Sequence, residues 1–132
     1  ADIHFLRARC HEILGEKDAT ISDLQAALGL EPKNLETRKM LDQTLRFSRP
    51  QEERLPNLNE MINLPDGEKH VHRRAGVLLD LGRFEEAIVD FERAGELGEV
   101  GSDRWHYAGL ILAHFRLGNR ARVLELFDQA LR

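Results

Sequence analysis

Apolar residues recur at steps of three and four along most of the chain, which is the spacing of one face of an α-helix. In the clearest stretch these residues are Val71, Ala75, Leu78 and Leu79. Gly82 then interrupts the pattern, and a glycine there can adopt the left-handed conformation that ends a helix. The same apolar spacing resumes over residues 87–94. The pattern therefore predicts two helices joined by a tight turn.

The sequence also matches itself when it is shifted by 67 residues, as from Gly15 to Gly82. The other matched pairs are Arg7 with Arg74, Ala8 with Ala75, Leu14 with Leu81, Ile21 with Ile88, Asp23 with Asp90, Ala27 with Ala94, and Leu30 with Leu97. Half of this shift is close to the ~34-residue period of helix–turn–helix repeats. The spacing predicts four units, each with a first helix, a turn and a second helix. Their ranges are 1–34, 35–67, 68–101 and 102–132.

Residues 82–94 resemble the signature of the tetratricopeptide repeat family. That signature has a turn glycine, an aromatic residue, a small residue, a second aromatic residue and an alanine, and the places are filled by Gly82, Phe84, Ala87, Phe91 and Ala94. Residues 15–32 are similar, but Lys17 and Thr20 replace the first aromatic residue and the small residue. The resemblance implies an all-α fold, namely a right-handed superhelical α-solenoid of about four antiparallel helix pairs, in a single domain over residues 1–132.

The second and fourth units depart from this pattern. The second unit lacks a turn glycine and carries Pro56 where its second helix begins. Proline is tolerated only in the first turn of a helix, so we expect a short helix that ends by residues 65–67, with a loop over residues 49–67 as the alternative. In the fourth unit the turn glycine, Gly118, comes two residues late. This delay predicts a longer first helix or a local bulge.

The composition fits a folded domain, since 42% of the 132 residues are hydrophobic and 32% are charged. The net charge of -4 argues against a general nucleic-acid binder, which usually carries a basic excess. The single cysteine, Cys10, cannot form an internal disulfide, and we expect it to be a small packing residue on a helix.

No apolar run approaches the ~20 residues of a membrane helix, so we expect no contact with a membrane. The chain begins with Ala1, which suggests a piece of a longer protein or a processed form. A cytoplasmic location is expected, with the periplasm and other compartments left open.

The sequence contains no motif of a catalytic or metal site, such as a P-loop or a zinc-binding helix. The histidines do not form a metal-binding set, because His70 and His72 point to opposite sides of a helix and the other pairs lack the spacing of a zinc site. We therefore expect no catalytic residue, no metal and no cofactor, and the chain is not expected to be an enzyme.

In tetratricopeptide stacks the first helix of each unit lines an inner groove, so the resemblance implies a peptide-binding groove there. Its expected residues are Arg9, Lys39, Gln43, Arg46, Lys69, His72, Arg73 and His106. Leu110 and His114 of the fourth unit are expected beside them. The set leans basic, which favours an acidic or carboxylate-bearing peptide through charge-assisted hydrogen bonds. An ordinary solvated helix face is the alternative interpretation.

The leading functional hypothesis is a scaffold that binds a peptide or protein segment in this groove. One alternative is an RNA-binding helical repeat of the pentatricopeptide type, which shares the helix pair. Another is an accessory domain of an enzyme whose catalytic part lies outside the chain. Self-association is also expected through the last helix, where Leu124, Phe127 and Leu131 share one face.

Overall fold

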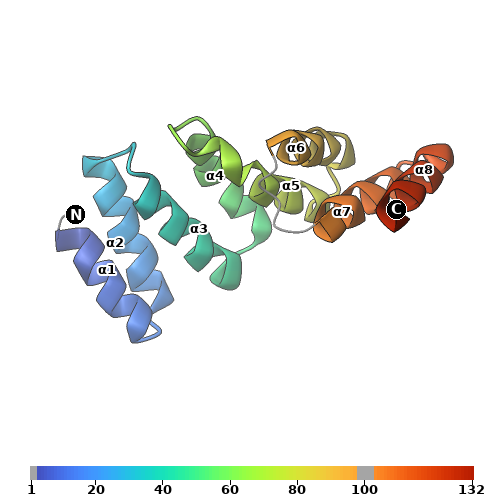
Figure 1. The fold of residues 1–132 in the computed structure, drawn as a ribbon. Coiled ribbons are helices and arrows are strands. Elements are labelled where there is room, and N and C mark those ends of the chain that lie inside the picture. The colour runs from blue at the N-terminus through green and yellow to red at the C-terminus, as the bar shows by residue number, and fades with distance from the viewer. Residues whose placement is uncertain (1–2, 98–102) are drawn as a thin grey trace. The chain divides into compact units, whose positions relative to one another are not determined.

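The computed structural model describes residues 3–97 and 103–132, and these residues form eight α-helices and two short 3-10 helices. In chain order the elements are α1 (Ile3–Ile13), α2 (Lys17–Leu30), α3 (Leu35–Ser48), η1 (Gln51–Arg54), α4 (Leu55–Ile62), η2 (Glu68–His70), α5 (Val71–Asp80), α6 (Phe84–Leu97), α7 (Asp103–Arg116) and α8 (Arg120–Leu131). Successive helices pair in an antiparallel manner, as Figure 1 shows for each unit taken by itself. The predicted all-α fold of about four helix pairs is therefore confirmed.

The chain divides into two compact units, Ala1–Pro65 and Asp66–Arg132. The first unit contains the helix pairs α1–α2 and α3–α4, and the second contains α5–α6 and α7–α8. The single domain over residues 1–132 and the right-handed superhelix stay predictions. No helix in the described part of the chain combines the length and apolar character that crossing a membrane requires.

Three of the four first helices end in the same way, at a glycine in the left-handed conformation. Gly15, Gly82 and Gly118 have φ angles of 77°, 78° and 80°. The residue after each glycine donates its backbone N–H to a carbonyl five residues earlier, as Arg83 does to Leu78 at 2.9 Å. This arrangement satisfies carbonyls that the helix end would otherwise leave unpaired. α7 stays α-helical up to Arg116, so the late Gly118 reflects a longer first helix and not a bulge.

The second helix pair uses proline in place of glycine to make its turn. Arg49 has extended backbone angles after α3 ends, and Pro50 follows it. Pro56 lies within the first turn of α4, where its missing N–H leaves no helical hydrogen bond unmade. The short second helix is confirmed and the alternative of a loop over residues 49–67 is wrong. α4 has 8 residues, whereas α2 and α6 each have 14.

The second pair also has charged residues at positions that are small in its neighbours. Asp42 lies 34 positions after Ala8, and Arg54 lies 34 positions after Thr20. All four side chains are buried, and the Arg54 guanidinium donates to both Asp42 oxygens at 2.8 and 3.1 Å. A buried charge that loses its partner costs about 3–5 kcal/mol. The two charges therefore have to be kept together in this repeat.

A second polar contact joins the helices of three pairs. A buried residue of the second helix, Asp23, Asn57 or Asp90, accepts hydrogen bonds from an arginine of the first helix. The arginines are Arg7, Arg38 and Arg74 respectively. Because guanidinium and carboxylate groups match each other in two parallel bonds, the Arg7–Asp23 and Arg74–Asp90 contacts also fix the orientation of the two helices.

Small residues allow the closest helix contacts, as the sequence predicts for Ala8, Ala75, Ala27 and Ala94, all of which are buried. Gly109 is the extreme case, because a Cβ atom at this position would lie 2.3 Å from the Phe91 ring. The sequence likewise predicts a close contact for Ala130 at the end of α8, and this expectation is wrong, since the residue is exposed. No helix of the described residues follows α8 to cover it.

We expect Gly109→Ala to destabilise the fold by about 1–3 kcal/mol, because the Phe91 ring must move to admit the methyl group. Urea denaturation of the variant measures this loss. Gly76→Ala is the matched control, since Gly76 lies inside α5 and a Cβ there meets nothing within 4 Å. It should gain roughly 0.5–1 kcal/mol from the lower flexibility of alanine. Equal stability of Gly109→Ala and the unchanged chain would contradict the close contact.

Candidate functional site

The groove residues expected in the first unit lie on the first helices, α1 and α3. Gln43 and Arg46 line one hollow of about 410 Å³ beside the α1–α2 turn. Its other lining residues are Glu12, Gly15, Lys17, Thr20, Thr44 and Phe47. The Arg46 guanidinium lies 5.3 Å from the centre of the exposed Phe47 ring. This hollow therefore offers an aromatic surface with two cationic groups and one carboxylate.

The two remaining groove residues of this unit do not line that hollow. Arg9 is exposed on α1, and Lys39 is half-buried on α3. The Lys39 ammonium lies 3.4 Å from the Glu36 carboxylate, so part of its charge is already compensated within α3. The structure thus brings Gln43 and Arg46 together but gives Arg9 and Lys39 separate surroundings.

The second unit contains a more apolar hollow of about 410 Å³ between α5, α6 and α7. It is lined by His72, Gly76, Leu79, Asp80, Phe91, Ala108, Gly109 and Leu112. The absence of a side chain at Gly76 leaves space on α5, and Gly109 brings α7 onto the Phe91 ring. Leu112 is 43% exposed at this hollow, so a ligand can reach apolar surface there.

Only one of the expected groove residues of the second unit, His72, lines this hollow. Lys69 is exposed in η2, and its backbone carbonyl lies 3.1 Å from the His72 Nδ1 atom. Arg73 is half-buried on α5. The side chain of His106 lies outside the described part of the structure.

Two expectations about the burial of side chains are wrong. Leu110 is 3% exposed and belongs to the core, because it shares the inner side of α7 with Gly109 and Ala113. Cys10 is exposed and does not pack. It lies two residues after the buried Ala8, which places it on the opposite side of α1.

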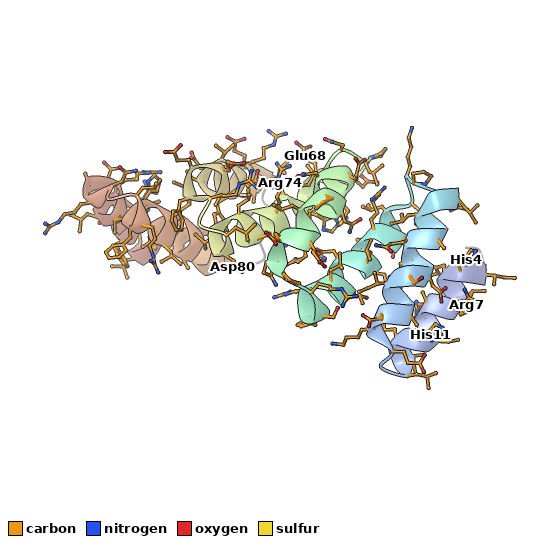
Figure 2. The ribbon with its side chains drawn as sticks, turned by 180° about the vertical axis from the view of Figure 1, so that it is seen from behind. His4, Arg7, His11, Glu68, Arg74 and Asp80 are labelled. Carbon is orange, nitrogen blue, oxygen red and sulfur yellow. The ribbon has the colours of Figure 1, made fainter. Side chains whose placement is uncertain are left out.

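The polar contact of the first helix pair has an unusual charge environment. Figure 2 shows His4, Arg7 and His11 together on α1. Hydrogen bonds from Arg7 hold the pKa of Asp23 below its usual range, although burial of this carboxylate acts in the opposite direction. His11 adds a second positive partner when it is protonated, since its Nε2 atom lies 3.5 Å from Asp23 Oδ2. In the equivalent contact of α5 and α6, hydrogen bonding to Asp90 raises the pKa of Arg74.

Among the residues that the structure describes, no set of three or more His, Cys, Asp or Glu side chains could hold a metal ion. The acidic residues Glu85 and Glu86 are exposed in the first turn of α6, where negative charge favours the helix N-terminus.

Comparison with known proteins agrees with this architecture. Residues 1–34 and 71–97 match the family described as Tetratricopeptide repeat, and these ranges contain the pairs α1–α2 and α5–α6. These two ranges are therefore tetratricopeptide repeats. No curated protein matches its sequence.

Solved structures of the protein MamA share the fold of this chain. A MamA mutant superposes with a TM-score of 0.78 at 21% identity, covering 96% of this chain and 73% of the other. Two further MamA crystal structures give TM-scores of 0.79 and 0.77, at 17% and 20% identity. They cover 97% of this chain and 69% and 72% of theirs. At such low identity the likeness is one of fold alone.

Reasoning from the repeats overlooked the arginine–carboxylate contacts and the apolar hollow. The sequence did contain a signal for the arginine–carboxylate contacts, because Arg7 and Asp23 both recur 67 residues later as Arg74 and Asp90. Identical charged residues at matching repeat positions indicate a shared contact between the two helices. The hollow had no comparable signal, since it depends on how closely α7 approaches Phe91.

The lowered pKa of Asp23 gives the first repeat a pH-dependent stability. Its contribution is complete above the unfolded carboxyl pKa of about 3.9 and is lost as the pH falls through the lower folded value. We therefore expect Asp23→Asn to lower the Tm at pH 7, and the difference from the unchanged chain to shrink below about pH 4. Thermal unfolding followed by circular dichroism at pH 7 and at pH 2 measures both differences. Asp128→Asn, which alters an exposed pair on α8, is the control with little effect at either pH. A Tm difference for Asp23→Asn that does not change with pH would show that the ionised Asp23 carboxylate is not the source of the stabilisation.

Proposed function

We propose that this chain is an interaction scaffold that binds a segment of another protein on the faces of its first helices. The apolar hollow of the second unit is the observation that carries this proposal. Its size falls within the range of binding pockets in proteins, about 300–1,000 Å³. Its lining is mostly aliphatic and aromatic, with His72 and Asp80 as the polar groups. Such a hollow suits an apolar side chain of the bound segment.

The first unit supports a preference for an acidic segment. Lys17 and Arg46 line its hollow together with one carboxylate, Glu12, and Arg9 is exposed on the neighbouring α1. Guanidinium groups bind carboxylates through charge-assisted hydrogen bonds, which are roughly twice as strong as neutral ones. The proposed partner therefore presents carboxylates to the first unit and an apolar side chain to the second. The scaffold acts by binding and performs no chemistry of its own.

The first experiment captures partners from a lysate of the source cell on the immobilised chain, with and without RNase, and identifies them by mass spectrometry. A protein that is retained after RNase treatment is then bound directly, and its Kd is measured. We expect Gly76→Leu to weaken this binding by about tenfold or more, equal to ~1.4 kcal/mol, because the new side chain fills the hollow.

The matched control is Gly29→Leu, since Gly29 is an exposed residue of α2 at which a Cβ also meets nothing within 4 Å. This variant should bind like the unchanged chain. Equal Kd values for both variants would place the binding surface elsewhere. Partners that disappear with RNase would favour the RNA-binding alternative instead.

Two further expectations belong to this proposal and stay predictions. Self-association through α8 is one, and the stripe expected for it is exposed. The cytoplasmic location is the other.

A further inference from the structure

The apolar hollow of the second unit has a carboxylate at its edge, that of Asp80 at the end of α5 (Figure 2). His72 is the other polar side chain of the lining, and its Nδ1 atom already lies 3.1 Å from the carbonyl oxygen of Lys69. The Asp80 side chain is exposed, and it makes no ion pair or hydrogen bond with any residue that the structure describes. The hollow therefore combines an apolar lining with one uncompensated negative charge.

The position of Asp80 is unfavourable for the chain on its own. Asp80 is the last residue of α5, and the last turn of this helix contains no basic residue. The partial negative charge at a helix C-terminus favours cations there and disfavours a carboxylate. The other three first helices do carry a basic residue in the last turn, namely His11 in α1, Arg46 in α3 and His114 in α7. The charge of Asp80 therefore does not serve the stability of α5.

Asp80 also lies close to the space that a ligand can enter. It follows Gly76 by one helical turn, and a Cβ atom at Gly76 would meet nothing within 4 Å. Side chains four residues apart share a face of a helix and lie about 5–6 Å from each other. An apolar group placed over Gly76 would thus lie beside the carboxylate and displace water from it. A charge that loses water without gaining a partner opposes binding.

We propose that the protein segment bound in this hollow carries a lysine or arginine next to its apolar anchor, and that this cation pairs with Asp80. The anchor packs on Leu79, Leu112 and the Phe91 ring, while the ammonium or guanidinium group compensates the carboxylate. An uncharged residue in place of the cation leaves Asp80 unpaired, and an acidic one is repelled, so the carboxylate selects among apolar segments. This pairing rests on the proposed function, since it requires that the hollow binds a protein segment.

Selection from a phage library of random peptides on the immobilised chain tests the pairing. The peptides that depend on the hollow are those that bind the unchanged chain but not Gly76→Leu, once circular dichroism has shown this variant to be folded. We expect these peptides to be enriched in lysine or arginine within one helical turn of an apolar residue. Their Kd for Asp80→Asn should rise about three- to tenfold, because the ion pair is lost. Asp80→Lys should instead select peptides with an acidic residue beside the anchor.

Glu92→Gln is the matched control, since Glu92 is an exposed residue of α6 that does not line the hollow. It removes the same charge as Asp80→Asn and should leave the Kd unchanged. Thermal unfolding gives a second measurement, because Asp80→Asn should raise the Tm by roughly 1–4 °C while it weakens binding. A Tm that falls together with the affinity would make Asp80 a residue that supports the fold and would overturn the pairing.

The remaining outcomes separate this pairing from the proposed function. Hollow-dependent peptides without an excess of basic residues would overturn the pairing and leave the binding function standing. Equal Kd values of such peptides for Asp80→Asn and the unchanged chain would have the same meaning. A selection that yields no peptide sensitive to Gly76→Leu would overturn both.

Discussion

Packing of a second helix on the next first helix is the contact on which the rest of this structure depends. One helix pair cannot bury its apolar face alone, so each pair needs a neighbour. In the first unit α2 meets this need by inserting Ile21, Leu24 and Leu28 against α3. In the second unit α6 does so by placing the Phe91 ring on the backbone of α7 at Gly109. Each unit is held together by such a contact.

One repeat position shows how the same packing accepts different chemistry. Ala8, Asp42, Ala75 and Gly109 occupy equivalent places on the four first helices, and all are buried. At Asp42 the space is filled by a charge that Arg54 neutralises. At Gly109 the space is taken by a larger ring from the preceding helix, because Phe91 replaces the Leu24 of the first unit. The volume and charge at this position are therefore matched to a partner residue in each repeat, and changing one member alone is unfavourable.

The helix pairs were predictable from the sequence because turn glycines and apolar spacing are local features. Gly15, Gly82 and Gly118 all end helices as expected, and the place of Pro56 correctly indicates a short α4. Residues whose surroundings depend on a neighbouring repeat were harder to place. Ala130 is exposed, whereas Leu110 turns into the core. The prediction that Cys10 is a packing residue was wrong for the same reason, because only a helix preceding α1 would cover the side of α1 on which Cys10 lies. The candidate binding site was also hard to predict from the sequence, since the hollow of the second unit arises from the spacing between helices and not from a motif.

Hydrogen exchange of the dilute, monomeric chain tests most directly whether neighbouring helices provide the stability of each helix. Within the second unit α6 packs on both α5 and α7, whereas α8 packs mainly on α7. Amides in the low-stability parts of a protein exchange through local opening, and those in the core exchange only through global unfolding. If stacking provides the stability, the amides of α6 will be protected to the level of global unfolding and those of α8 will exchange through easier local opening. Equal protection of α6 and α8 would show that α8 is stable without a second neighbour and would contradict this explanation of the fold.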